Sequence, residues 1–483
     1  MTKIILNGRE IEADPTKPLI AACEGNGAAV PHYCYHAGLT PVGSCRICQV
    51  EVKEGERPGR VVVACRTPVS EGMVVNTESP AAHETRRECL EFLLKDHPLD
   101  CPICDKAGEC TLQDVTYNEG QSEGLTKEPR DNFEKRKSLG DKIVLDQERC
   151  ILCSRCVRFF DEITGKSQLA IVGLGSRSRI ETFADRPLVG NYQGNITDIC
   201  PVGALTLKSF RFKARVWNMT KKSSTCGECS RGCSVSVEVL RKGEVKRIRP
   251  RFNEDINKWW MCDTGRFALD GANPTNRVPA LVRGYSGLEA ADSDDAVAMA
   301  RAAHAAVDKH VLIASPWVTV EEGEGLKALA SSLNTEALFL SPAANDLKDD
   351  LLHTGDPCPN RRGLEELGFV GKSAEEAMEL LAQAESATLF GERIAELIGL
   401  DNLKSLPSTV RTFVFDGSSG AGLLEAPALQ AVVGIANWVE RPGTWVNIDG
   451  ERGKISAART APSGIRQPSS VIADLLHTSE VAR

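Results

Sequence analysis

The length, composition and charge of the chain exclude several classes of protein. Its 483 residues are 42% hydrophobic, 26% charged and 5% aromatic, so it is long enough for about three or four domains with cores of their own. The 58 basic and 66 acidic residues give a formal net charge of −8, which offers no overall positive field for nucleic acid or anionic lipid. No apolar stretch reaches the roughly 18 to 20 residues that span a bilayer, and the first residues lack a signal-peptide pattern. We therefore expect a cytoplasmic protein that binds no nucleic acid and reaches a membrane only through partners.

The predicted elements of the first part of the chain are short. Residues 3–11 alternate as in a hairpin about the turn Asn7-Gly8, which begins a small sheet-rich module. Residues 81–95 have apolar side chains at helical spacing, and the chain then becomes rich in cysteine and loop-like up to residue 117. Residues 234–248 predict a strand-turn-strand about Lys242-Gly243. Modules this small bury little core, so bound metal would have to supply folding free energy.

The composition changes after Pro274 to alanine-rich helical patterns that alternate with short apolar strands. Helices are predicted near residues 293–307 and 373–384. This alternation predicts a parallel, doubly wound sheet. The candidate strands begin at Val311, Ala337, Ala387 and Thr412.

Cysteine is distributed unevenly along the chain. Of the 18 cysteines, 17 precede residue 263 and only Cys358 follows it. Clustered cysteines in a long chain without a secretion signal indicate metal ligands rather than a disulfide framework. Fifteen of them, with one histidine, form four sets of four. The other three, Cys23, Cys89 and Cys358, are interpreted as buried or free thiols.

The first set, the Cys34 group, consists of Cys34, Cys45, Cys48 and Cys65. Its spacing is a longer-loop version of the plant-type ferredoxin arrangement, and Gly43 lets backbone amides turn toward the sulfides of a [2Fe–2S] cluster. His36 offers a Rieske alternative, but no second Cys-x2-His follows it. We therefore interpret the set as four cysteine ligands and His36 as structural.

The second set, the His97 group, consists of His97, Cys101, Cys104 and Cys110. One histidine and three cysteines suit a tetrahedral zinc ion as well as an iron–sulfur cluster. The residues alone leave both alternatives open.

The third set, the Cys150 group, consists of Cys150, Cys153, Cys156 and the distant Cys200, which precedes Pro201. Three cysteines at two-residue gaps with a separate Cys-Pro are typical of a bacterial ferredoxin [4Fe–4S] site. Only one complete set of this kind exists, so Cys200 is expected to complete the same site.

The fourth set, the Cys226 group, consists of Cys226, Cys229, Cys233 and Cys262. Four thiolates fit a [4Fe–4S] cluster or a zinc ribbon, and the spacing favours the cluster only modestly. The basic run at residues 241–251 is interpreted as the solvated face of a hairpin, because no interleaved aromatic residues support nucleic-acid binding.

The order of the four sets resembles the large iron–sulfur subunit of bacterial NADH:quinone oxidoreductase, respiratory complex I. The resemblance is strong over residues 1 to about 270 and weak beyond. It implies that the Cys34 group holds one [2Fe–2S] cluster and that the His97, Cys150 and Cys226 groups each hold a [4Fe–4S] cluster, without catalytic residues.

The same resemblance implies a multidomain α+β and α/β fold with an N-terminal ferredoxin-like β-grasp domain and a C-terminal domain similar to a shortened molybdopterin oxidoreductase. Catalytic members of that superfamily carry a lysine soon after the last cluster cysteine, whereas this chain has Arg266 in Cys262-Asp-Thr-Gly-Arg. We therefore expect no molybdopterin. The implied segments are a [2Fe–2S] domain at 1–78, a [4Fe–4S] domain at 79–118, a linker at 119–140, [4Fe–4S] domains at 141–217 and 218–274, and the degenerate domain at 275–483.

The family's function implies an oxidoreductase complex subunit that carries electrons and binds no substrate. Electrons would come from the NADH/FMN-binding flavoprotein and pass to the quinone-side iron–sulfur subunits, on the cytoplasmic side of the inner (plasma) membrane in a peripheral arm. The Cys226 group would lie off this path. The alternatives are an electron-transfer subunit of a NAD-linked hydrogenase or formate dehydrogenase, and a zinc-stabilised scaffold.

Overall fold

The computed structural model describes residues 1–120, 123–275, 277–417 and 426–477. These residues form two compact units, Met1–Trp217 and Asn218–Arg483, and each is described by itself.

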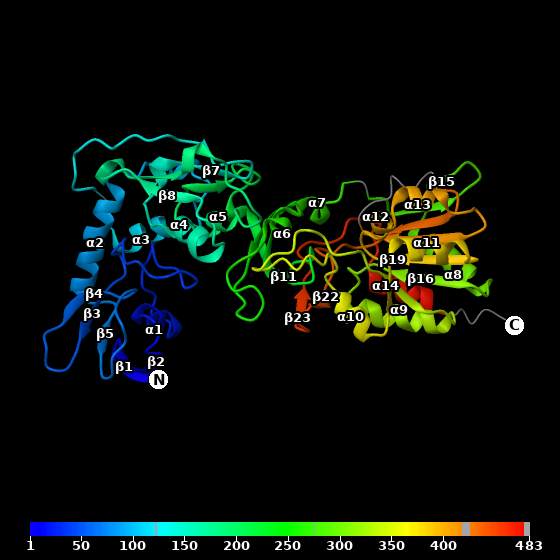
Figure 1. Cartoon of the computed structure of the whole chain (residues 1–483), viewed down its shortest axis with the longest axis horizontal. Coiled ribbons are helices and arrows are strands. Elements are labelled where there is room, and N and C mark those ends of the chain that lie inside the picture. Colours follow the sequence, from blue (N-terminus) through cyan, green and yellow to red (C-terminus); the bar gives the residue numbers. More distant parts are fainter. Residues whose placement is uncertain (121–122, 276, 418–425, 478–483) are drawn as a thin grey trace. The chain divides into compact units, whose positions relative to one another are not determined.

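The first unit begins with a five-stranded sheet in the order β2-β1-β5-β3-β4 (Figure 1). Strands β1 and β2 form the predicted hairpin, in which Leu6 pairs with Arg9. Asn7 and Gly8 both have positive φ, as a two-residue turn of this kind requires. Helix α1 packs Leu19 and Ile20 against the sheet. The bounds are β1 Thr2–Leu6, β2 Arg9–Ala13, α1 Leu19–Gly25, β3 Gln49–Lys53, β4 Arg60–Val63 and β5 Val74–Asn76.

The predicted helix near residues 81–95 is confirmed as α2, Pro80–Leu94. Ser79 caps it by accepting a hydrogen bond from the Ala82 amide at 3.2 Å. The expectation of a loop up to residue 117 is wrong in its last part, because helix α3 spans Thr111–Glu119. Helix α3 buries Leu112 and Val115, three positions apart, an apolar pattern too short to stand out in a polar sequence.

The rest of the first unit consists of very short elements. One sheet has the order β10-β7-β6, and β8 pairs with β9. Strand β6 lies inside the expected linker and has two residues. The bounds are β6 Lys137–Ser138, β7 Ile143–Leu145, α4 Arg155–Arg158, β8 Leu169–Val172, β9 Arg179–Thr182, α5 Asn195–Ile199 and β10 Leu205–Leu207.

The second unit begins with a three-stranded antiparallel sheet in the order β11-β12-β13. The predicted hairpin around Lys242-Gly243 is confirmed, and it joins β12 to β13. Two short helices follow, α6 and α7, and a two-stranded ribbon of β22 and β23 belongs to the same unit. The bounds are β11 Met219–Thr225, β12 Ser234–Leu240, β13 Val245–Pro250, α6 Asp263–Phe267, α7 Leu269–Ala272, β22 Gly443–Val446 and β23 Arg452–Ile455.

An eight-stranded sheet forms the core of the second unit, in the order β15-β14-β21-β20-β19-β16-β17-β18. Strands β16 to β21 run parallel to their neighbours, as the alternating pattern predicts, whereas β14 is antiparallel to both β15 and β21. The strands are β14 Ala280–Arg283, β15 Leu288–Ala290, β16 His310–Ala314, β17 Ala337–Leu340, β18 Val370–Lys372, β19 Ser386–Phe390, β20 Arg411–Asp416 and β21 Leu429–Gly434.

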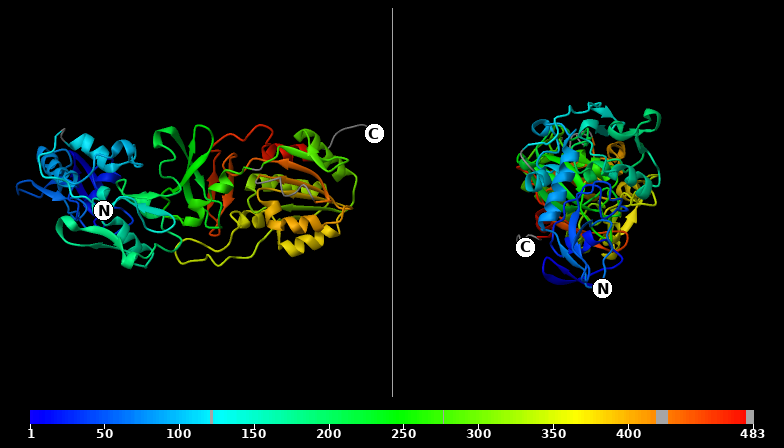
Figure 2. Two further views of the ribbon diagram at one scale, coloured as in Figure 1. Left: turned by 90° about the horizontal axis from the view of Figure 1, so that it is seen from above. Right: turned by 90° about the vertical axis from the view of Figure 1, so that its left-hand side faces the viewer.

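Helices cover both faces of this sheet, seen from different directions in Figure 1 and Figure 2. Helices α8, α9 and α14 pack on one apolar face, which includes Phe339, Phe390 and Phe413. Helices α11, α12 and α13 pack on the other face. The helices are α8 Ser293–Ala305, α9 Val320–Ser332, α10 Arg361–Glu366, α11 Ala374–Ala382, α12 Ile394–Ile398, α13 Leu400–Ser405 and α14 Pro468–Leu476.

Candidate metal centres

The four residues of the His97 group line one cavity of the first unit, together with Arg149 and Gly203. His97 follows α2, and Cys110 is the N-cap of α3. The Nδ1 atom of His97 is buried without a hydrogen-bond partner in the described part of the chain, which leaves it available as a ligand. Burial lowers the pKa of His97 to about 4. The imidazole is therefore neutral near pH 7, the form that binds metals.

The four cysteines of the Cys150 group also line a single cavity. Leu152 and Ser154, which lie between the first three cysteines, both have positive φ. Such left-handed residues turn successive amides to one side of a loop and create a concave surface for an anion. Cys200 joins from the end of α5. Predicted ligands that lie up to fifty residues apart are thus brought together.

The Cys34 group is held by loops around the five-stranded sheet. The Cys34 amide donates to the Cys45 Sγ at 3.4 Å, and Gly43 and Arg46 have positive φ. Hydrogen bonds from the Cys45 and Cys65 thiols lower the pKa of Cys34, and Cys48 bonds to Cys65 in the same way. All four sulfurs therefore lie in one group.

His36 belongs to the same region but is tied to its local backbone. Its Nδ1 accepts a hydrogen bond from the Gly38 amide at 3.1 Å. The Nδ1 of His32 bonds the Val30 carbonyl at 2.9 Å. Both histidines therefore have structural partners.

The Cys226 group lies in the second unit, beside the β11-β12-β13 sheet. The Cys226 amide donates to the Cys233 carbonyl at 2.8 Å, and the Gly265 amide donates to the Cys262 Sγ at 3.4 Å. Burial raises the pKa of Cys262 to about 12, with a further contribution from Cys229. The four thiols are buried and close to one another.

Two glycines allow the backbone to approach these sulfurs closely. A Cβ atom on Gly203 would lie 2.2 Å from the Cys104 Sγ, and one on Gly265 would lie 2.6 Å from the Cys226 Sγ. Both distances are far below a van der Waals contact. Sequence reasoning missed Gly203, although its position three residues after Cys200 was a signal that could have identified it.

The arrangement of the four groups differs from that of a single-ion site. In the described part of the chain, no three His, Cys, Asp or Glu side chains converge closely enough to hold one metal ion. The ligands of a [4Fe–4S] cubane bind four different iron atoms, so they lie farther apart than the ligands of one zinc ion.

The three remaining cysteines have protein neighbours. Cys23 belongs to the apolar core of the first sheet. Cys89 donates to the Arg46 carbonyl at 3.5 Å. Cys358 is buried and accepts a hydrogen bond from Arg361 at 3.3 Å.

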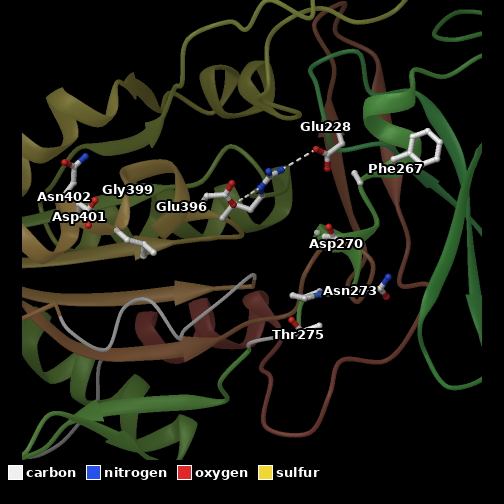
Figure 3. A pocket seen from close by; sticks show the side chains of 14 residues that line it. Glu228, Phe267, Asp270, Asn273, Thr275, Glu396, Gly399, Asp401 and Asn402 are labelled. Atoms are coloured by element: carbon white, nitrogen blue, oxygen red, sulfur yellow. Dashed lines mark hydrogen bonds and ion pairs between the residues drawn. The ribbon is translucent and has the colours of Figure 1, made fainter. Parts of the chain in front are cut away.

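A cleft of about 1010 Å³ opens in the second unit beside residues 267–275 and 399–402 (Figure 3). An ion pair at 3.5 Å joins Glu228 to Arg393 in this cleft, and Arg393 also pairs with Glu396 at 3.3 Å. None of the sixteen predicted ligands lines it. No helix in the described residues is long and apolar enough to cross a membrane.

Comparison with known protein families gives four matches in chain order. Residues 1–80 match a 2Fe-2S iron-sulfur cluster binding domain. Residues 86–124 match the NADH-ubiquinone oxidoreductase-G iron-sulfur binding region. Residues 140–206 match the ferredoxin-like domain of NADH-quinone oxidoreductase subunit 3, and residues 230–270 match the NDSU1/NuoG-like 4Fe-4S domain. Domains that bind 2Fe-2S and 4Fe-4S clusters are therefore present.

Individual relatives agree with these matches. The mitochondrial NADH-ubiquinone oxidoreductase 78 kDa subunit of Neurospora crassa is 38% identical over 70% of this chain and 46% of its own length. A NADH-quinone oxidoreductase subunit of Rickettsia prowazekii is 39% identical over 56% of this chain and 39% of its own length. A chain from the crystal structure of a NAD+-reducing [NiFe]-hydrogenase is 30% identical, with a TM-score of 0.38, over 44% of this chain and 91% of that chain.

The chain spans less than half of the length of these two oxidoreductase subunits. The matched domains nevertheless follow one another from residue 1 to residue 270. By these domains and by its relatives, the chain belongs to the NuoG-like family, the large iron–sulfur subunits of NADH-quinone oxidoreductase.

Proposed function

We propose that the chain is an electron-carrying subunit of a complex I-like NADH:quinone oxidoreductase. The observation that carries this proposal is the continuity of the Cys150 and His97 sites. Arg149 lines the His97 cavity and its neighbour Cys150 lines the other, while Gly203 lines the first and Val202 and Ala204 the second. Two sites that share backbone segments are close enough to serve as successive electron carriers.

The proposed ligands are the four groups predicted from the sequence, with one [2Fe–2S] cluster in the Cys34 group and one [4Fe–4S] cluster in each of the other three. When bound, such clusters accept and release single electrons, at potentials set by net charge, hydrogen bonds to sulfur and solvent exposure. The chain itself contributes ligands, buried surroundings and fixed positions. The orphaned His97 Nδ1 and the glycines that face Cys104 and Cys226 support this assignment.

The surroundings of Cys101 suggest where a partner binds. Cys101 is exposed and lines an open hollow of about 720 Å³ with Tyr117 and Trp217, whose side chains are 90% and 59% exposed. Exposed aromatic residues are typical anchors of protein interfaces. We propose that a quinone-side iron–sulfur subunit binds here and that the NADH/FMN-binding flavoprotein supplies electrons, in a peripheral arm on the cytoplasmic side of the membrane.

The C-terminal unit is proposed to be a degenerate molybdopterin-oxidoreductase-like domain without the cofactor. Doubly wound sheets bind ligands at the carboxyl ends of strands where the strand order reverses, which here is between β16 and β19. Buried side chains of the chain itself fill this place: Arg441 and Trp445 both donate to the Trp317 carbonyl, at 3.0 and 3.1 Å. The Trp438 amide donates to the buried Glu392 at 2.8 Å.

The experiment that tests the function separates the arrival of electrons from their onward transfer. In the isolated complex, C153S and C101S should lower NADH-to-quinone activity at least tenfold, whereas NADH oxidation by ferricyanide, which takes electrons near the flavin, should persist. C89S serves as the matched control, because Cys89 lies outside the four groups. Full quinone reduction by a C153S complex that has lost its cluster would contradict the proposal. The hydrogenase and formate dehydrogenase alternatives are not favoured, since both oxidoreductase relatives carry NADH-oxidoreductase names.

A further inference from the structure

Two buried arginines of α4, Arg155 and Arg158, connect the Cys150 site to the loop that carries Cys34. Each is 8% exposed. Arg155 lines the same cavity as the four cysteines of the Cys150 group. It donates one hydrogen bond to the Ile199 carbonyl at 2.9 Å and another to the Tyr35 carbonyl. Arg155 therefore joins the residue before Cys200 to the residue after Cys34.

Arg158 makes the same connection one turn later. It donates to the carbonyls of Cys34, of Thr40 at 2.6 Å and of Cys153 at 3.4 Å. The two side chains thus hold the loop of residues 34–40 against the loop that begins the Cys150 group. Both sites lie within the first unit.

The acceptors of these two guanidinium groups are neutral. Arg155 bonds backbone carbonyls, and Arg158 bonds carbonyls and the Ser154 hydroxyl at 3.1 Å. Within the described ranges, neither arginine has a carboxylate within ion-pair distance. A buried charge without a countercharge costs several kcal/mol. The anions nearest to Arg155 are thiolates, those of Cys153, Cys200 and Cys45.

Arg149 of the His97 site provides a contrast inside the same unit. It is 4% exposed, and it donates to Asp100 at 3.2 and 2.9 Å and pairs with Asp146 at 3.3 Å. Its positive charge is therefore compensated by two carboxylates. The charge beside the Cys150 site is compensated by no carboxylate, so the thiolates and whatever they bind must supply the countercharge.

We propose that Arg155 and Arg158 are positioning residues that hold the Cys34 and Cys150 sites together and whose positive charge favours the reduced state of the Cys150-group cluster. The inference rests on the proposed function. Reduction adds one electron and one negative charge from the donor side, and no bond breaks. A fixed cation in a buried site stabilises the more negative state and raises the reduction potential.

The test is a redox titration of the full-length protein in its complex, followed by EPR. The signal of the Cys150-group cluster is identified by its loss in C153S. R155M should lower the ratio of reduced to oxidised cluster at a fixed potential at least tenfold, which corresponds to about 59 mV for one electron. R155K keeps the charge and should stay within threefold of the unmodified protein. R57M removes an exposed arginine charge and should leave the titration unchanged.

Three results would overturn the proposal. They are an unshifted titration in R155M, a shift in R155K as large as in R155M, and loss of the cluster from both variants alike. Loss of the cluster from R155M and R158M, with retention in R155K and R158K, would support it, because the charge would then be required for assembly. Absence of iron from the unmodified protein would refute cluster binding itself, whereas loaded but unshifted variants would refute only the role of the arginines.

Discussion

The two compact units differ in how much regular structure surrounds their cysteine groups. After its first sheet, the Met1–Trp217 unit has strands of two to four residues in sheets of two or three strands. The Asn218–Arg483 unit contains an eight-stranded sheet with an apolar cluster on each face. Small isolated sheets are marginally stable in water, whereas a large covered sheet provides its own core.

The two units therefore draw their stability from different sources. In residues 80–217, the turns around the cysteines occupy the place that a larger core would fill, and bound clusters would supply folding free energy. In the second unit, the sheet and its helices fold on hydrophobic burial. Perturbing each unit in turn tests this difference, and iron removal is expected to have the largest effect.

Removal of iron by anaerobic chelation should destabilise the two units unequally. Structural metals contribute on the order of 10 kcal/mol to small domains, so amide exchange should increase strongly over residues 141–207. Strands β16, β19 and β20 should keep their protection. Hydrogen exchange measured by mass spectrometry before and after chelation makes the comparison, and an equal loss of protection in both units would contradict it.

Replacement of Phe413 in β20 should affect only the second unit. Phe413 is 1% exposed in the apolar cluster under α8, α9 and α14, and F413A should cost roughly 3 to 5 kcal/mol. Denaturant unfolding checks the loss, and the EPR signals of the first unit should remain. The matched control is F183A in the first unit, where Phe183 is 78% exposed, with an expected change within about 0.5 kcal/mol. Loss of EPR signals of the first unit in F413A would argue against separate sources of stability.

A methyl group at Gly203 should disturb the His97 site. The added Cβ would lie 2.2 Å from the Cys104 Sγ, so G203A should cost roughly 1 to 3 kcal/mol and alter or abolish the EPR signal of that site. G124A is the control, because a Cβ atom there meets nothing within 4 Å. An unchanged spectrum in G203A would show that the His97 group does not hold its cluster against this backbone.

Acid should weaken the second unit through a buried histidine pair. His304 and His310 lie with ring centroids 4.4 Å apart, and burial lowers their pKa values to about 4 and about 3. The unfolded chain binds protons near pH 6.5 while the folded chain does not, so stability is lost as pH falls below 6.5. The loss should be up to about 1.4 kcal/mol per pH unit for each imidazole. Unfolding of H310F at pH 7 and pH 5 should show a weaker dependence on pH, and an unchanged slope would exclude His310 as a source.

Much of the second unit and the grouping of the cysteines could be predicted from the sequence. Spacing alone brought Cys150, Cys153 and Cys156 together, and apolar alternation predicted β16, β17, β19 and β20. Helix α3 was missed because its apolar residues are few. The antiparallel β14 was missed because strand direction depends on pairing with β21, some 150 residues away.

The surroundings of the sites could not be predicted for a similar reason. Arg155 reaches Tyr35 across 120 residues, and Gly203 faces Cys104 across about one hundred. No local pattern marks such contacts, because they depend on how separate loops meet. The ligands are recorded in short motifs, whereas the groups that tune them are recorded only in the fold.

The most direct test of cluster binding is the metal content of the anaerobically purified protein, together with EPR of the dithionite-reduced sample at several temperatures. Four filled sites predict about 14 irons per chain and signals from one [2Fe–2S] and up to three [4Fe–4S] clusters. About 10 irons would leave one cubane site unfilled, with the Cys226 group examined first. Stoichiometric zinc with a silent spectrum would contradict the electron-carrier function and favour a zinc-stabilised scaffold.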